Sequence, residues 1–269
     1  PAYEPLFTPF SIRNTRIKNR YFMAAMGTVT HNDEDGAYLP DAVDYFVRRA
    51  AGGVGLIITG ANWVDNNIEV HSPGSFPCPT ICPRKYIKAA RELTDRVHAF
   101  DTKIFVQLTA GLGRSAMPAM IHDRKFVAPS TISNRWNPRI ECRELTTEEV
   151  ERLGVSAAIA KKCGYDGVEV HAVHEGYLLD CFAMSLFNKR TDKYGGDLNG
   201  RLRFAIEIVQ KIKQYCGEDF PVILRFSLKS YIKDLRQGAV PGETFTELGR
   251  DTDEGLQAAR ILVDAGYDA

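Results

Sequence analysis

The sequence lacks any excess of charge of one sign. Its 34 Lys and Arg residues balance its 34 Asp and Glu residues, so the formal net charge is zero. No long basic block stands out. Proteins whose main partner is a nucleic acid or an anionic membrane carry basic clusters that attract phosphate groups. We therefore expect neither of these partners.

Long hydrophobic runs are also missing. The longest ones, residues 54–59 and 104–108, have the length of a strand and fall far short of the roughly 20 residues that a membrane-spanning helix needs. The first ten residues, PAYEPLFTPF, do not combine a charged region with an apolar core as a secretory signal does. These features predict a soluble, cytoplasmic protein.

Cysteine is too scarce for a disulfide framework, with six residues in a chain of 269. Cys78 and Cys82 form a C-x3-C pair within the Pro-rich segment PCPTICP. A metal site is one interpretation of this pair, but no second pair at ligand spacing follows it. We interpret both residues as reduced loop cysteines and expect no metal.

What the sequence does contain is a regular alternation of apolar runs and amphipathic segments. Each apolar run predicts a strand and each amphipathic segment a helix, which is typical of βα units that form a parallel sheet with helices outside it. The expected strands are residues 21–26, 54–59, 103–108, 166–170 and 221–226, and the expected helices are residues 41–51, 84–100, 146–163, 198–215 and 253–265.

The strand count predicts part of a barrel. Gly266-Tyr267-Asp268-Ala269 repeats the Gly164-Tyr165-Asp166 that precedes the fourth strand, so a sixth strand is expected to begin there. A (β/α)8 TIM barrel has eight strands. We expect residues 1–269 to form the N-terminal portion of such a barrel, with five to six of its eight βα units, ending before strands seven and eight. An open five-stranded sheet is the alternative.

The most informative segment is residues 168–179, VEVHAVHEGYLL, at the end of the fourth strand. His171, His174, Glu175 and Tyr177 gather there, on the face of a barrel where substrates and cofactors bind. Two histidines and a carboxylate can also bind zinc. In a further interpretation one histidine is buried in the core and the other is exposed. His171 and His174 can converge only if the strand ends between them, because strand residues three apart point to opposite faces.

Two polar residues lie inside apolar strands. Gln107 and Arg225 interrupt runs that are otherwise hydrophobic, and burying such groups without a partner is costly. They are therefore expected either to pair or to serve a function. Met26 and Gly60, taken alone, are typical of core packing and of a turn.

The run from His171 to Phe204, HAVHEGYLLDCFAMSLFNKRTDKYGGDLNGRLRF, resembles the Old Yellow Enzyme family of FMN-dependent ene-reductases (NADH:flavin oxidoreductases). Within that family the chain is most similar to the iron–sulfur branch of 2-enoate, 2,4-dienoyl-CoA and bile-acid enoate reductases. The resemblance implies that residues 1–269 form an FMN-binding TIM-barrel domain. It also implies hydride transfer to the C=C bond of an enoyl or enone compound, or the reverse. NAD(P)H would be the electron source, with FAD and a [4Fe-4S] cluster in a full-length parent.

The resemblance assigns roles to individual residues. His171 and His174 would bind the carbonyl oxygen and stabilise an enolate, and Tyr177 would give a proton to the α-carbon. Gly60 would leave room for the flavin ring because it has no side chain. Cys181 stands where the family commonly has Gln, and the phosphate-binding loops would lie beyond Ala269. The implied FMN contacts are Ala25, Met26, Gly27, Gly60, Gln107, His171 and Arg225.

Two rival functions stay open from the sequence. One is a metal-dependent TIM-barrel hydrolase that uses His171, His174 and Glu175. The other is an inactive half-barrel with two open sheet edges, which would favour pairing with a second copy as a homo-oligomer.

Overall fold

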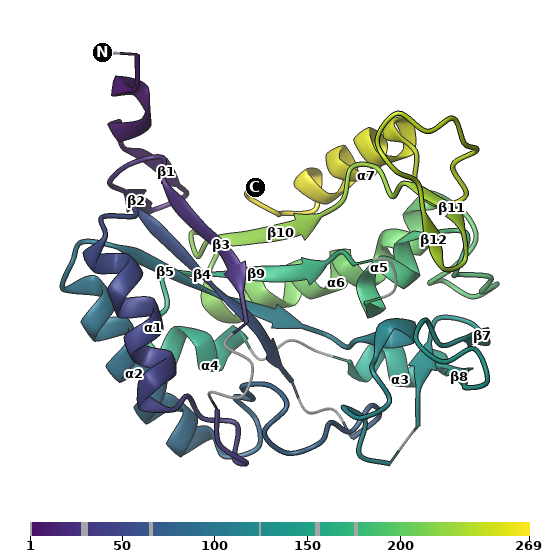
Figure 1. The fold of residues 1–269 in the computed structure, drawn as a ribbon, viewed down its shortest axis with the longest axis horizontal. Helices are drawn as coiled ribbons and strands as arrows, with labels where there is room; N and C mark the ends of the chain where they lie inside the picture. Colours follow the sequence, from purple (N-terminus) through teal and green to yellow (C-terminus); the bar gives the residue numbers. More distant parts are fainter. Residues whose placement is uncertain (1, 28–31, 65–66, 124, 154–156, 175–176) are drawn as a thin grey trace.

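The centre of the protein is a curled sheet of five parallel strands (Figure 1). The computed structural model describes residues 2–27, 32–64, 67–123, 125–153, 157–174 and 177–269. From one edge to the other, the strands are β10 (Val222–Phe226), β9 (Gly167–Ala172), β5 (Lys103–Thr109), β4 (Leu56–Trp63) and β3 (Phe22–Met26). All four pairings are parallel, so the five expected strands and their common direction are confirmed.

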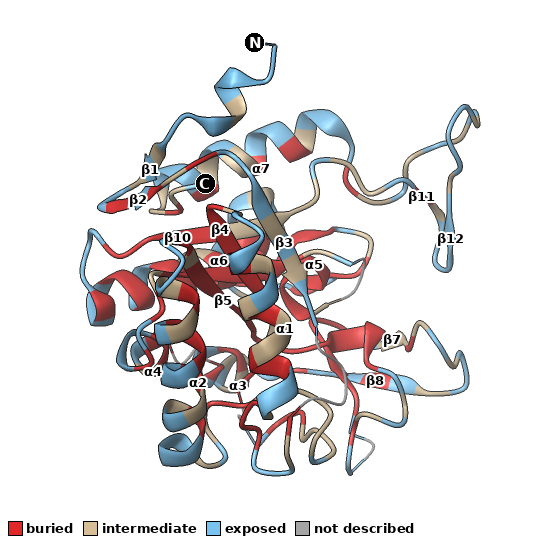
Figure 2. Cartoon of the chain, turned by 60° about the vertical axis from the view of Figure 1, so that its left-hand side comes forward, coloured by how far each residue is buried: buried red, intermediate tan, exposed pale blue. Residues whose placement is uncertain are grey.

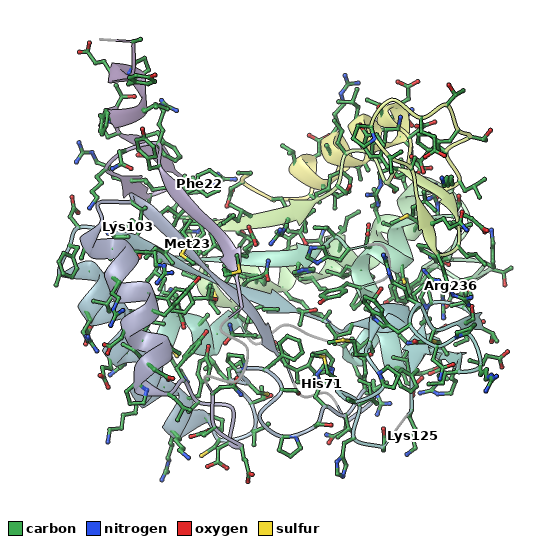
Figure 3. The ribbon with its side chains drawn as sticks, in the orientation of Figure 1. Phe22, Met23, His71, Lys103, Lys125 and Arg236 are labelled. Atoms are coloured by element: carbon green, nitrogen blue, oxygen red, sulfur yellow. The ribbon has the colours of Figure 1, made fainter. Side chains whose placement is uncertain are left out.

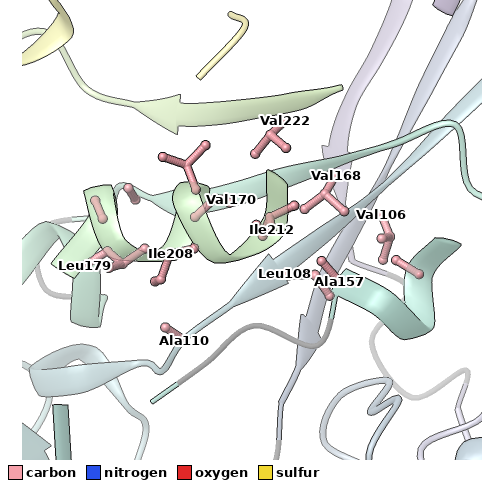
Figure 4. Close-up of a cluster of buried hydrophobic side chains, with 14 of the residues drawn as sticks. Val106, Leu108, Ala110, Ala157, Val168, Val170, Leu179, Ile208, Ile212 and Val222 are labelled. Atoms are coloured by element: carbon pink, nitrogen blue, oxygen red, sulfur yellow. The ribbon is translucent and has the colours of Figure 1, made fainter. Parts of the chain in front are cut away.

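Alternation along each strand separates the two faces of the sheet. On β9, Val168 and Val170 point outward and pack in the main core with Ile208 and Ile212 of α6 (Leu198–Cys216) (Figure 4). Glu169 and His171 alternate with them and point into the curl. The outer face therefore buries hydrocarbon against helices, while the inner face is free to carry polar groups.

Helices cover the outer face of the sheet (Figures 1 and 2). Besides α6, they are α1 (Pro40–Ala51), α2 (Pro83–His98), α3 (Thr147–Arg152), α4 (Ala157–Lys162), α5 (Leu178–Ala183) and α7 (Thr252–Asp264). No helix in the described part of the chain is long and apolar enough to cross a membrane.

The prediction of a single helix over residues 146–163 is wrong, because two short helices, α3 and α4, lie in this part of the chain. A capping box begins α3, because Thr146 Oγ1 accepts a hydrogen bond from the Glu149 backbone N–H and the Glu149 carboxylate accepts one from the Thr146 backbone N–H. However, α3 ends at Leu153, whose backbone is extended (φ −62°, ψ 116°) and whose side chain is only 2% exposed. The chain leaves the helix there and buries this leucine in the core. α4 begins after residues 154–156, which lie outside the described ranges.

The segment expected to begin a sixth strand does pair with β10. The Asp268 N–H donates to the Val222 carbonyl at 2.8 Å, and the Leu224 N–H donates to the Ala269 carbonyl at 2.9 Å. The Asp268 side chain adds a buried ion pair with Lys213 of α6, at 2.7 Å. The segment is thus tied to both the strand and the helix of the preceding unit.

A hairpin that the sequence analysis did not predict fills one end of the inner face. It consists of β1 (Phe10–Ile12) and β2 (Thr15–Ile17), which are antiparallel. Ile17 packs with Leu56, Phe105 and Ile223, near the starts of β4, β5 and β10. At the sheet edge, Phe22 of β3 is 59% exposed whereas Met23 packs against the outer core (Figure 3).

Most of the remaining small elements follow the ends of the strands. Arg236, at the turn of the hairpin β11–β12 (Figure 3), donates a hydrogen bond to Ser133 of β7 at 3.0 Å. These elements are β6 (Val127–Ala128), β7 (Ile132–Ser133), β8 (Glu141–Glu144), β11 (Ile232–Asp234), β12 (Gln237–Gly238), and the 3-10 turns η1 (Glu4–Phe7) and η2 (Gly113–Ser115).

Gly60 lies inside β4 rather than after the second strand, where it was expected. A Cβ atom at this position would lie 2.2 Å from the Gly27 Cα atom. The space left by the missing side chain is therefore occupied by the backbone at the end of β3. Glycine is needed here because two neighbouring strands approach each other closely.

Replacing Gly60 with Ala should lower the free energy of unfolding by about 1–3 kcal/mol or more, because the new methyl group would collide with backbone rather than with a movable side chain. Denaturant unfolding measures the effect. The matched control is Gly238→Ala in β12, where the added Cβ would meet Tyr231 O at an ordinary 3.6 Å. Equal stability of both variants would contradict the close approach of β3 and β4.

Candidate functional site

The inner face of the sheet carries a row of polar side chains near the carboxyl ends of the strands. Gln107 lies opposite Glu169 in the β5–β9 pairing, and Arg225 lies opposite His171 in the β9–β10 pairing. The Gln107 Nε2 donates to Glu169 Oε1 at 2.6 Å. Gln107 thus has the partner that its burial requires, and that partner is a carboxylate which the sequence analysis did not select.

Burial governs the charge of Glu169. The residue is 6% exposed, and desolvation raises the pKa of its carboxyl group, with the Gln107 hydrogen bond and the Arg225 charge acting in the opposite direction. The sequence signal that could have identified it is the alternation V-E-V-H in β9. It places Glu169 on the same inner face as His171.

Arg225 connects the two edges of the sheet. Its Nη1 donates to the Ala25 carbonyl at 3.3 Å, which joins β10 to β3. The same positive charge affects the pKa values of Glu169, His171, His174 and Tyr177. Arg225 is therefore the central cation of the inner face, as expected for a strand arginine that is not in the apolar core.

His171, His174 and Tyr177 form one cluster of rings. The ring centroids lie 4.8 Å apart between His171 and His174, 4.5 Å between His171 and Tyr177, and 5.2 Å between His174 and Tyr177. β9 ends at Ala172, and the backbone of His174 has a positive φ of 72°. The condition for convergence, a strand that ends between the two histidines, is confirmed.

The cluster is neutral at physiological pH. Burial is the main cause that lowers the pKa of His171 to about 3, with the charges of His174 and Arg225 adding to it. Burial likewise lowers the pKa of His174 and raises the pKa of Tyr177. The two imidazoles can therefore each offer an N–H, and the phenol keeps its proton.

His171 carries an unsatisfied polar atom. The residue is 3% exposed, and its buried Nδ1 has no hydrogen-bond partner in the structure. Such an atom is costly unless a ligand supplies the missing partner. Together with the Gln107 amide and the Arg225 guanidinium, it fits a ligand with a polar, hydrogen-bonding edge such as FMN.

A cavity of about 490 Å³ opens beside the cluster, within the usual size range of small-molecule sites. Asp180 on its wall is paired behind the surface with Arg250, at 3.3 Å, and both side chains are almost fully buried. The lining residues are Phe76, Leu112, Ser115, Met117, Met120, Arg135, Trp136, Val173, His174, Tyr177, Asp180, Met184, Ser227 and Ser230. Most come from loops that follow the strands, and loops offer no periodic signal to sequence analysis.

The other residues that the sequence analysis named lie at the end of β3 or away from the cavity. Ala25, Met26 and Gly27 lie at the carboxyl end of β3, where Met26 is 53% exposed. Cys181 does not line the cavity but is buried in a small cluster with Met184, Phe187 and Ile232. The six cysteines are free thiols, consistent with the interpretation of Cys78 and Cys82.

The residues described here give the metal-site interpretation no support. Glu175, which that interpretation requires, lies outside the described ranges together with Gly176. Among the described residues, no group of three or more His, Cys, Asp or Glu side chains lies close enough to hold a metal ion.

Comparisons with known proteins agree on one family. The model of the "NADH:flavin oxidoreductase / NADH oxidase family" matches residues 5–268. A cinnamate reductase of Clostridium sporogenes is 54% identical over 99% of this chain and 41% of its own length. An NADPH dehydrogenase of Bacillus subtilis is 34% identical over 98% of this chain and 71% of its own length. The chain thus spans less than half of the length of the cinnamate reductase.

The structural comparison agrees with the sequence comparisons. A solved 2-naphthoyl-CoA reductase complex superimposes with a TM-score of 0.80 and 27% identity, covering 99% of this chain and 40% of the other. The curled parallel sheet therefore has the arrangement found in that reductase, in agreement with the α/β fold of repeated βα units expected from the sequence.

Because His171 is neutral in the folded protein, it should make stability depend on pH. The unfolded chain binds a proton at this residue below its ordinary pKa of about 6.5, whereas the native state does so only near 3. Stability from this residue is therefore complete above the ordinary pKa and decreases as the pH falls. The expected contribution is about 1.4 kcal/mol per pH unit between roughly pH 6 and pH 4.

The variant His171→Gln should remove this part of the slope of unfolding free energy against pH, as measured by denaturant titrations at a series of pH values. The control is His122→Gln, because His122 is exposed on a loop. An unchanged slope in the His171 variant would show that the imidazole is not held neutral.

Proposed function

The chain belongs to the NADH:flavin oxidoreductase / NADH oxidase family, and on that basis we propose that it forms the substrate site of an FMN-dependent ene-reductase. The proposed reaction adds a hydride to the β-carbon of an α,β-unsaturated carbonyl or acyl compound and a proton to its α-carbon, or runs in reverse. The observation that carries the proposal is the convergence of His171, His174 and Tyr177 beside one cavity.

In this proposal the two histidines bind the carbonyl oxygen of the substrate. When a hydride is added to the β-carbon, the electron pair of the C=C bond shifts and negative charge develops on that oxygen. Two fixed N–H donors stabilise the developing enolate without reorganising at the moment of reaction. His171 and His174 suit this role because burial keeps both imidazoles neutral, so neither transfers a proton to the oxygen.

Tyr177 is the proposed proton donor to the α-carbon. Its ring stacks on His171 at 4.5 Å and lines the cavity, so a substrate held by the histidines would lie beside the phenol. Burial, together with the charge of Glu69, raises its pKa. The phenol therefore remains protonated until the α-carbon becomes basic.

FMN, when bound, would supply the hydride. The proposed contacts to its ring are the amide of Gln107, the Nδ1 of His171 and the guanidinium of Arg225, which would offset the negative charge that reduction brings. Ala25, Met26 and Gly27 would meet the ring at the end of β3, and Gly60 would act indirectly by letting Gly27 approach β4. NAD(P)H is the proposed electron source, with FAD and a [4Fe-4S] cluster as further carriers in a longer parent protein.

The proposed substrates are enoates and enones with an aromatic substituent. The relative with 54% identity is named a cinnamate reductase, and the cavity wall here includes the aromatic rings of Phe76, Trp136 and Tyr177.

The first test asks whether the protein binds flavin and reduces an alkene. The protein would be purified with added FMN and desalted, and its absorption recorded. We expect a retained flavin band in the visible range that bleaches on anaerobic reduction and returns when cinnamate is added. Stoichiometric zinc with no retained flavin would instead favour the metal-dependent hydrolase.

The second test separates proton donation from hydride transfer. Tyr177→Phe should lower the rate of alkene reduction about 100-fold or more, since a positioned general acid contributes that much, while flavin binding stays unchanged. Stopped-flow absorbance with an enone substrate measures the rate of alkene reduction, and the flavin absorbance of the desalted protein measures flavin binding. Tyr215→Phe is the control, because Tyr215 is 71% exposed at the end of α6. Full activity of the Tyr177 variant would remove this residue from the mechanism.

A further inference from the structure

The cavity beside the histidine cluster is lined by both polar and apolar side chains. His174 and Tyr177 supply polar atoms. Phe76, Leu112 and Met120 supply only carbon and sulfur, and all three belong to one apolar cluster, against which the ring of Tyr177 also packs. A substrate held by its carbonyl group would therefore place its substituent against an apolar wall.

Trp136 stands in this wall in an unusual state. Its side chain is 57% exposed, yet its indole N–H donates to the Ser115 carbonyl at 2.8 Å. Its backbone N–H donates to the side chain of Asn134 at 2.9 Å. One hydrogen bond fixes the ring of Trp136 and the other fixes its backbone, so this exposed side chain has already lost much of its conformational entropy.

The loop that carries Trp136 is anchored from below. Asn134 is fully buried, and its amide donates to the carbonyls of Arg114 and Ala116 at 2.9 and 2.8 Å. These residues and Ser115 belong to the segment around η2, which also contributes to the cavity. The indole is therefore fixed relative to the η2 segment, and a fixed surface loses little entropy when it binds a ligand.

We propose that Trp136 is a specificity-determining residue that binds a planar aromatic substituent of the substrate against the apolar wall. The inference rests on the proposed function, which sets the position of the carbonyl group at His174. It goes beyond that function because it assigns the choice between aromatic and alkyl substrates to one side chain.

The chemistry of the wall favours an aromatic ring over an alkyl chain. Flat rings stack on an indole and meet its edge favourably, and the sulfur atoms of Met117 and Met120 make favourable contacts with aromatic rings. A flexible alkyl chain gains the same burial but loses rotational freedom on binding. The fixed indole should therefore discriminate between two substrates of similar length.

The test measures binding without turnover. Cinnamate is the aromatic probe and 2-hexenoate the alkyl probe, each titrated by calorimetry into the flavin-loaded protein without NAD(P)H. Trp136→Ala should weaken cinnamate binding at least 10-fold, about 1.4 kcal/mol, while 2-hexenoate changes less than 2-fold. Trp136→Phe keeps a ring but loses the bond to Ser115, so its loss of cinnamate affinity should be smaller. Tyr215→Ala is the control on an exposed aromatic residue outside the cavity.

Fluorescence gives a second, independent measurement. The chain has two tryptophans, of which Trp63 is 2% exposed and Trp136 lines the cavity. Cinnamate should quench the Trp136 emission saturably in the wild type, and the quenching should be absent in Trp136→Phe.

Equal loss of affinity for both probes in Trp136→Ala, or unchanged affinity for cinnamate, would overturn the proposal. Lack of cinnamate binding by the wild type would overturn it as well. These results are distinct from a failure of the proposed function, which would appear as absent flavin or absent alkene reduction even when cinnamate binds.

Discussion

The hydrogen bond from Arg225 to the Ala25 carbonyl spans the inner face of the sheet, from β10 at one edge to β3 at the other. It is possible only because the five parallel strands curl strongly, as twisted parallel sheets do. The curl brings the inward residues of every strand toward a common centre and gathers the carboxyl ends at one opening. The polar row, the ring cluster and the cavity all depend on that shape.

A polar interior has to be compensated. Glu169 is nearly fully buried, and a buried carboxylate without partners would be very costly. Here the Gln107 amide donates to it and Arg225 stands close enough to stabilise its charge. Hydrophobic burial on the outer face, where strand valines pack against α6, supplies the stability that allows these groups to remain inside. The two faces of the sheet thus divide stability and chemistry between them.

This difference between the two faces also explains which parts of the structure could be predicted from the sequence. Outward residues produce continuous apolar runs, so all five strands were predictable, and the run-in at Asp268 was predictable from its internal repeat. The break at Leu153 was not, because the local pattern favours a helix and only the core determines that the leucine turns inward. The need for glycine at position 60 could not be predicted either, because it comes from the close approach of Gly27, which is far away in the sequence. Trp136 lies in a loop and carries no periodic signal, and Asp180 lies in α5, which at six residues is too short to show a clear helical period.

The sequence showed what the convergence of His171 and His174 requires, a strand that ends between them, but it did not give the positions of the two rings. The strand ends at Ala172, and the positive φ of His174 turns the chain so that two side chains three residues apart face each other. This turn places a neutral donor pair beside a permanent cation. The imidazoles lose their charge because burial and Arg225 both disfavour it, whereas an arginine keeps its charge at any accessible pH. Hydrogen-bond donation and positive charge are therefore supplied by different residues. In the proposed reaction, negative charge that develops on the carbonyl oxygen would be stabilised by imidazole N–H groups that keep their protons, while Tyr177 would protonate the α-carbon.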